Sequence, residues 1–257
     1  MTEHDVSTRG RSVPVGDAAE RRGLAARVRA VVYPALIEQV PRDHQQSNSA
    51  FRRRRIVVVI ALAVGAALLG FSLATKPGDP AFYPLTVAVA AVWIIGGFLS
   101  GPLHLGYIPF RGTLRRPVIT PIAFGLLASA IFLVGGVIIR QIDPLRQFVQ
   151  HVLDHAQQGN LALVCVVALL NGAAEEVFFR GALFAAIGRK HPIAISVVVY
   201  ALVTVATANP MLVFAAVVMG TLFALQRRAS GGILAPMLTH LTWSAVMLFA
   251  LPAVIGS

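Results

Sequence analysis

Glu175, Glu176 and Arg180 are the residues of this sequence with the clearest chemical potential, because these ionisable side chains lie close together in an apolar stretch. A charge near the centre of a bilayer costs on the order of 2.5–3.5 kcal/mol even on a lenient insertion scale, so such residues usually have a function. Glu175 would lie about 100° around a helix from Glu176. Two neighbouring carboxylates disfavour each other's ionisation, which suits proton transfer. The cluster therefore predicts an acid–base site.

A purely structural role is the alternative for two of these residues. Glu176 and Arg180 are four positions apart, so they share a helical face and can form an ion pair that only holds helices together. This alternative leaves Glu175 unexplained.

A second polar group lies near the end of the chain, where His240 and Ser244 are spaced to share one helical face. A single histidine in a membrane helix is often only a hydrogen bond between helices, so its role stays open. Thr239 and Thr242 are expected to bond back to their own helix. Cys165 is the one cysteine, which excludes an intramolecular disulfide, and we interpret it as a core residue.

The elements that must position these residues are membrane helices. The 257 residues are 56% hydrophobic and 13% charged, whereas an ordinary soluble domain is about 25% charged. A helix needs roughly 20 apolar residues to cross a bilayer. Seven apolar segments satisfy or approach this length: Ile56–Thr75, Ala81–Ser100, Pro117–Ile139, Leu161–Ile187, Pro192–Ala208, Met211–Gln226 and Gly231–Ile255. The sequence predicts an all-α, polytopic bundle of about seven transmembrane helices, with Met211–Gln226 the weakest span at about 24 Å.

The distribution of basic residues predicts the orientation of this bundle. Cytoplasmic loops collect Lys and Arg, and with the N-terminus inside, 18 of the 22 basic residues fall on the cytoplasmic side and three on the outer side. We therefore expect a multi-pass protein of the cell membrane with a cytoplasmic N-terminus. Because 11 basic residues lie in residues 1–55, topology explains the net charge of +11 better than nucleic-acid binding does.

The first 55 residues are expected to form a basic, largely disordered cytoplasmic tail without a cleavable signal peptide. Leu24–Val40 is more apolar and could lie on the membrane surface until Pro34 interrupts it. The Arg52–Arg55 run is interpreted as a topology anchor, with an anionic-lipid or partner site as the alternative. Two N-terminal helices would follow over 56–116, and a membrane core over 117–257.

The helical rise places three polar positions at similar depth. Glu175 would lie about 9 Å from the cytoplasmic face, or about 19 Å when measured from Gly188. His240 would lie about 14 Å and Thr204 about 18 Å from the cytoplasmic ends of their helices. These positions allow a shared pocket that opens toward the cytoplasm.

At this point the sequence resembles the CPBP intramembrane proteases, which include the type II CAAX prenyl endopeptidases and bacteriocin-related proteins. The run Glu175-Glu176-Val-Phe-Phe-Arg180-Gly181 is similar to the first family motif. Ala235-Pro236-Met-Leu-Thr-His240-Leu-Thr-Trp-Ser244 is similar to the third, in which an Asn or Asp follows the His by four positions. The likeness covers about residues 120–250.

Two positions depart from the family pattern. The second motif, Phe-x-x-x-His, corresponds here to Tyr200-Ala-Leu-Val-Thr204, which lacks the histidine, and Ser244 stands in place of the Asn. A threonine does not titrate near neutrality and is not a usual zinc ligand. His191, the nearest histidine, is 13 residues earlier, roughly 20 Å away along a helix.

The resemblance implies roles for the remaining residues. Glu175 would be the general base, and Glu176 and Arg180 would orient it. His240 with Ser244 would bind the substrate carbonyl, and Thr204 would be a second substrate-binding residue. Family members can hold a metal, but His240 and a carboxylate fall short of the three protein ligands that a catalytic zinc normally has. We therefore predict no tightly bound zinc and leave the cofactor open.

Three hypotheses for function follow. The first is an endopeptidase that cuts a membrane-associated protein or peptide, with chemistry weakened by Thr204. The second is a non-catalytic scaffold or immunity-type protein of the same fold that only binds peptide. The third is a transporter with Glu175 and Glu176 as a proton relay. The sequence identifies no prenyl-binding groove.

Overall fold

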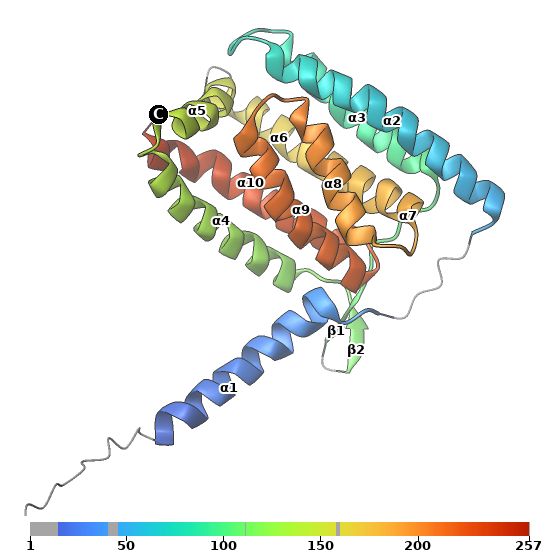
Figure 1. Ribbon diagram of the computed structural model, residues 1–257, viewed down its shortest axis with the longest axis vertical. Helices are drawn as coiled ribbons and strands as arrows, with labels where there is room; N and C mark the ends of the chain where they lie inside the picture. Colours follow the sequence, from blue (N-terminus) through green and yellow to red (C-terminus); the bar gives the residue numbers. More distant parts are fainter. Residues whose placement is uncertain (1–14, 41–45, 111, 158–159, 257) are drawn as a thin grey trace, which may run out of the picture.

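The helices of this chain form an all-α bundle, as predicted, in a computed structural model that describes residues 15–40, 46–110, 112–157 and 160–256 (Figure 1). Besides a short hairpin of β1 (Ile108–Phe110) and β2 (Thr113–Arg115), every element is helical. The helices are α1 (Val15–Val32), the π-helix η1 (Tyr33–Ile37), α2 (Asn48–Ala74), α3 (Phe82–Ser100), α4 (Ile119–Ile139), α5 (Asp143–Gln157), α6 (Leu161–Glu175), the π-helix η2 (Glu176–Leu183), α7 (Phe184–Ile187), α8 (Pro192–Val205), α9 (Pro210–Ser230) and α10 (Leu234–Ile255).

Six helices in the described part of the chain are long and apolar enough to cross a membrane: α2, α3, α4, the continuous run of α6, η2 and α7, α9, and α10. Their outward faces carry large apolar side chains such as Ile131, Val134 and Ile138 of α4, each more than 60% exposed. Apolar residues that face outward along whole helices are typical of contact with lipid. The chain is a multi-pass membrane protein.

The prediction that Met211–Gln226 is the weakest span is wrong. Asn209 caps α9, since its side chain accepts hydrogen bonds from the amides of Met211 and Leu212, and the helix runs for 21 residues to Ser230. The short helix is instead α8, with 14 residues and a length of about 21 Å. It pairs with α9 as an apolar hairpin (Figure 1).

Two further segments differ from the sequence prediction. Helix α1 covers Val15–Val32 within the tail that we expected to be largely disordered, because the segment is rich in Ala and Arg, which favour helix. The first 14 residues of that tail lie outside the described residues. Helix α5 occupies the segment between the predicted spans Pro117–Ile139 and Leu161–Ile187, and its apolar residues recur with helical period along one face.

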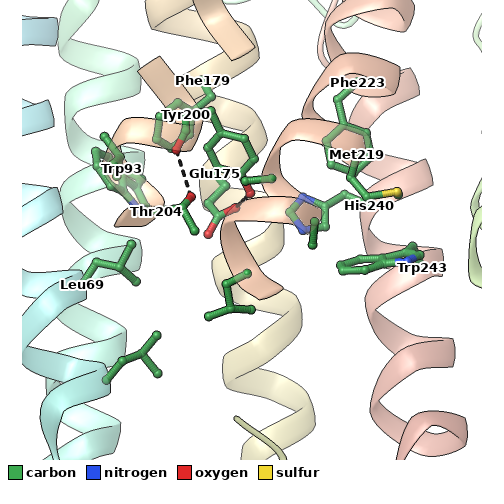
Figure 2. A pocket seen from close by; sticks show the side chains of 15 residues that line it. Leu69, Trp93, Glu175, Phe179, Tyr200, Thr204, Met219, Phe223, His240 and Trp243 are labelled. Atoms are coloured by element: carbon green, nitrogen blue, oxygen red, sulfur yellow. Dashed lines mark hydrogen bonds between the residues drawn. The ribbon is translucent and has the colours of Figure 1, made fainter. Parts of the chain in front are cut away.

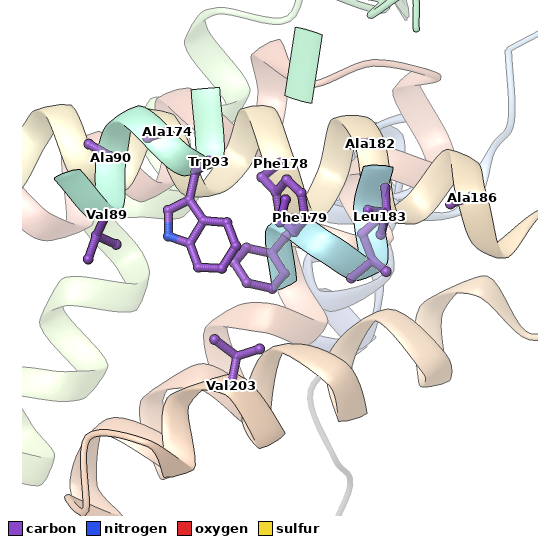
Figure 3. Packing of buried hydrophobic residues seen from close by; sticks show 12 residues of the cluster. Val89, Ala90, Trp93, Ala174, Phe178, Phe179, Ala182, Leu183, Ala186 and Val203 are labelled. Atoms are coloured by element: carbon purple, nitrogen blue, oxygen red, sulfur yellow. The ribbon is translucent and has the colours of Figure 1, made fainter. Parts of the chain in front are cut away.

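The bundle is arranged around the helix that carries the acidic motif. Helices α2 and α3 lie side by side along one edge, α4 packs on α10 at the other, and α6 with η2 contacts both α3 and α10 (Figure 1). Figure 3 shows the core beside the motif, where Trp93 of α3 packs on Phe178 and Phe179 of η2 with ring centroids 4.6 and 5.1 Å apart. Gly65 of α2 makes room for this tryptophan, because a Cβ there would lie 2.2 Å from the ring.

Candidate active site

The acidic motif lies where the backbone changes from α6 to the wider π-helix η2. Asn160 caps the start of α6 by accepting a hydrogen bond from the amide of Leu163, and Gly188 ends α7 with a positive φ of 84°. All eight residues of η2 are buried. π-helical turns are rare and occur frequently at functional sites, so the local backbone agrees with the prediction of a site here.

Glu176 and Arg180 form the ion pair expected from their spacing. Arg180 Nη1 donates to Glu176 Oε1 over 3.0 Å, and both side chains are fully buried. The pair also joins other helices, because Nδ1 of His240 on α10 lies 2.9 Å from Glu176 Oε1 and Arg180 Nη2 donates to the carbonyl of Gly220 on α9 over 3.3 Å. The pair thus connects three elements of the bundle, η2, α9 and α10.

Glu175 has a different environment from its neighbour. It is partly buried, and its Oε2 accepts a hydrogen bond of 2.5 Å from the phenol of Tyr200 on α8. Figure 2 shows that Glu175 and His240 face the same space. The two carboxylates are thus divided: Glu176 is enclosed in a buried network, and Glu175 is the one that reaches open volume.

That open volume, the Glu175 cavity, measures about 220 Å³. The side chains around it come from α2, α3, α6, η2, α8, α9 and α10: Leu69, Leu73, Trp93, Glu175, Phe179, Tyr200, Val203, Thr204, Leu212, Ala215, Ala216, Met219, Phe223, His240 and Trp243 (Figure 2). Most of this lining is apolar, and Glu175, Tyr200, Thr204 and His240 contribute the polar side chains that could contact a reacting group. This composition is typical of a small-molecule or peptide site.

The residues that line the Glu175 cavity indicate the end of the bundle toward which it extends. Leu73 lies at the C-terminal end of α2 and Leu212 at the N-terminal end of α9. Both ends are remote from the basic residues of Arg52–Arg55 and from Arg227 and Arg228, which occupy the opposite ends of the same helices. The lining residues therefore place the volume between Glu175 and the end of the bundle opposite to these basic residues.

Of the two remaining predicted site residues, Thr204 lines the cavity and Ser244 does not. Thr204 is 8% exposed, lines the cavity, and donates through Oγ1 to the carbonyl of Tyr200 over 2.9 Å. Ser244 is partly buried and is not among the lining residues, whereas Trp243 is. The structure thus brings Glu175, His240 and Thr204 together and leaves Ser244 outside.

Tyr200 is the functional candidate that sequence reasoning missed. Its position corresponds to the phenylalanine of the second family motif, and the additional hydroxyl is the group that binds Glu175. A phenol inside an otherwise apolar segment was the available signal, because a buried tyrosine hydroxyl usually finds a partner.

A zinc ion does not fit the donors at this site. Nδ1 of His240 is already bonded to Glu176, and the hydroxyl of Thr204 is directed to a backbone carbonyl. Among the residues that the structure describes, no group of three or more His, Cys, Asp or Glu side chains could hold a metal ion. A catalytic zinc normally takes three protein ligands, so we derive no step through a metal here.

Comparison with known families agrees with the motif resemblance. The model of the family described as type II CAAX prenyl endopeptidase Rce1-like matches residues 157–246. The matched segment runs from the end of α5 into α10 and contains Glu175, Tyr200, Thr204 and His240. No curated protein and no solved structure matches the chain.

Proposed function

Since residues 157–246 match the model of the Rce1-like type II CAAX prenyl endopeptidase family, we propose that this chain is an endopeptidase that hydrolyses a peptide bond of a membrane-associated protein or peptide. One observation carries the proposal. Of two adjacent carboxylates, Glu176 is fully buried in an ion pair while Glu175 faces a cavity that it shares with a histidine. A structural ion pair alone would not require the second carboxylate. We further propose that the protein resides in the cell membrane with its N-terminus in the cytoplasm.

In the proposed reaction Glu175 is the general base. It takes a proton from a water molecule as the water oxygen bonds to the carbonyl carbon of the substrate, and the carbonyl oxygen gains the negative charge. When the intermediate collapses, the C–N bond breaks and the proton passes from Glu175 to the leaving nitrogen. Tyr200 donates a hydrogen bond to Glu175, which fixes the orientation of the carboxylate.

His240 is the proposed oxyanion ligand. Glu176 accepts a hydrogen bond from Nδ1, so this nitrogen carries a proton. Nε2 is left for the substrate and donates to the oxyanion from the imidazolium form, in which both ring nitrogens carry a proton. Stacking on Phe223, at a centroid distance of 4.8 Å, holds the ring plane. Glu176 and Arg180 are accordingly positioning residues that act through His240 and the helix backbone. A fixed donor aimed at a developing oxyanion typically changes kcat by about 10²–10³-fold.

A non-catalytic peptide-binding protein of the same fold is the second candidate, and Thr204 is the observation that favours it. The threonine hydroxyl is committed to the carbonyl of Tyr200, so the cavity holds a single imidazole, from His240. Under this proposal the cavity binds a peptide segment and releases it uncut.

The two candidates are separated by comparing wild type with Glu175→Gln and Thr204→His in cells, followed by mass spectrometry of membrane-protein termini. We expect Glu175→Gln to remove specific cleavage products while the protein still inserts, because Gln cannot accept the proton from water. Thr204→His is expected to increase the same products. If wild type and Glu175→Gln give identical termini, the endopeptidase proposal is refuted and the binding role is favoured.

A further inference from the structure

Arg54 is the buried cation that the proposed function does not use. It lies in the second turn of α2, at the basic end of the bundle and remote from the Glu175 cavity, and it is 3% exposed. Its Nε donates to Gln46 Oε1 and its Nη2 to the carbonyl of Pro102, each over 3.3 Å. Its Nη1 is buried without a hydrogen-bond partner. One face of the guanidinium is therefore unsatisfied.

Among the described residues, the charge of Arg54 is also uncompensated. Within the part of the chain that the structure describes, no carboxylate forms an ion pair with it, and its neighbour Arg53 adds a second positive charge. A buried charge without a partner is costly, by several kcal/mol for an ion in a protein interior. The surroundings of Arg54 are those of an anion site.

A second cavity adjoins this guanidinium. The Arg54 cavity measures about 470 Å³ and is lined by polar and basic side chains and by small residues at the end of α3: Gln46, Ser47, Ser49, Ala50, Arg53, Arg54, Ser100, Gly101 and Pro102. Ser47 is the N-cap of α2, since its hydroxyl accepts from the amide of Ala50. The positive end of the 27-residue helix α2 therefore faces the same volume, and helix N-termini favour anions.

We propose that the Arg54 cavity binds a phosphate group. A phosphate offers several strong acceptor oxygens for the guanidinium groups of Arg53 and Arg54 and the hydroxyls of Ser47 and Ser49, which line the cavity, and arginine pairs well with phosphate geometry. The group can come from an anionic lipid headgroup at the membrane surface or from free phosphate. This assignment is independent of the peptidase proposal, because none of these residues lines the Glu175 cavity.

The rest of the Arg52–Arg55 run differs from this pair. Arg55 donates to the carbonyl of Ala186, and its guanidinium carbon lies 4.3 Å from the ring centroid of Phe51. Arg52 is exposed. Neither residue lines the Arg54 cavity. The basic run thus combines residues that suit a topology anchor with one buried ligand. Arg52 consequently provides a matched control with the same change of charge.

The test measures ligand retention by the purified full-length protein in detergent, using native mass spectrometry. The protein is mixed with phosphatidylglycerol, with diacylglycerol as a lipid without phosphate, or with inorganic phosphate. We expect wild type to retain phosphatidylglycerol or inorganic phosphate and not diacylglycerol. Arg54→Gln should weaken retention at least about tenfold, because a charge-assisted hydrogen bond is lost. Arg52→Gln should change it less than about twofold. Retention of phosphatidylglycerol that inorganic phosphate does not displace would identify the lipid as the source.

A second variant keeps the proposal testable if Arg54→Gln does not fold. Ser49→Trp fills the cavity without changing the charge and should abolish retention while the protein elutes as a folded species. The proposal is overturned if no phosphate-containing ligand is retained, if diacylglycerol is retained equally, if Arg52→Gln and Arg54→Gln have the same effect, or if folded Ser49→Trp binds like wild type.

Discussion

Replacing the two adjacent glutamates one at a time gives the sharpest test of the division between them. Glu176→Gln removes the negative charge that lies 3.0 Å from Arg180 and 2.9 Å from His240, and it leaves a fully buried guanidinium without its ion pair. Removing one partner of a buried pair costs about 3–5 kcal/mol. Because the Gln oxygen can still accept one hydrogen bond, we expect the lower end, about 3 kcal/mol.

Glu175→Gln is the matched control, since it makes the same chemical change one position earlier. Glu175 accepts a hydrogen bond from Tyr200 and faces a cavity, so the loss of its charge should cost about 1 kcal/mol or less. At about 2–4 °C per kcal/mol for a chain of this size, the melting temperature should fall by about 6–12 °C for Glu176→Gln and by no more than about 4 °C for Glu175→Gln.

The assay is thermal unfolding of each purified variant in the same detergent, monitored by tryptophan fluorescence. A double variant, Glu176→Gln with Arg180→Gln, should recover part of the loss, because it removes both buried charges together. If Glu175→Gln lowers the melting temperature as much as Glu176→Gln does, or if the double variant is less stable than the sum of the single ones, the division into a structural and a reactive carboxylate is incorrect.

Two other predictions concern stability. Gly65→Ala should lower the melting temperature by about 2 °C or more, since overpacking costs about 1–3 kcal/mol and the new Cβ would lie 2.2 Å from the ring of Trp93; a Gly65→Ala variant as stable as wild type would contradict this packing. The pKa of His104 is lowered from its ordinary value of 6.5, mainly because the side chain is partly buried and also because Arg227 and Arg54 are positively charged. The folded protein therefore binds fewer protons than the unfolded chain just below pH 6.5, so stability should decrease as the pH falls through 6.5 and level off below the folded pKa. His104→Gln should flatten this part of a plot of melting temperature against pH, and an unchanged slope would refute the assignment.

The sequence could predict those features that depend on local patterns, such as the length of an apolar segment or the spacing of two residues. The long apolar segments predicted the spanning helices, because hydrocarbon permits few other backbones. The four-residue spacing of Glu176 and Arg180 predicted their ion pair, and the similar depths of Glu175, His240 and Thr204 allowed the cavity that these three residues line.

The features that escaped prediction depend on contacts between distant helices. The bond between Tyr200 and Glu175 joins residues 25 positions apart on different helices, and no local spacing encodes it. Leu69, Leu73 and Trp93 line the cavity although they belong to the two N-terminal helices that we assigned to a separate segment. Depth along a helix is calculable from the sequence, but the choice of neighbouring helices is a result of packing.

Helix α5 is a different case, since its signal was present in the sequence. Its apolar residues recur three or four positions apart, but the segment lies between two predicted spans and is too polar to be one itself. The structure shows why a helix forms: Asn209 donates to the carbonyl of Phe148 over 2.8 Å, and buried His155 lies 3.0 Å from the carbonyl of Thr75. These two contacts tie α5 to the α8–α9 turn and to the end of α2, so tertiary contacts decide between two locally acceptable structures.

In the proposed orientation, the direction of the Glu175 cavity puts the two proposed sites on different sides of the membrane. The basic residues gather at the ends of α2 and α9 that hold Arg54 and Arg227, and the cavity extends toward the opposite ends, where Leu73 and Leu212 lie. With the basic end in the cytoplasm, the peptide site is reached from the outer half of the bilayer and the phosphate site lies on the inner surface. The two sites would then face different compartments, so a ligand at Arg54 could affect Glu175 only through the helices that join them, chiefly α2, which contributes Arg54 near one end and Leu73 near the other.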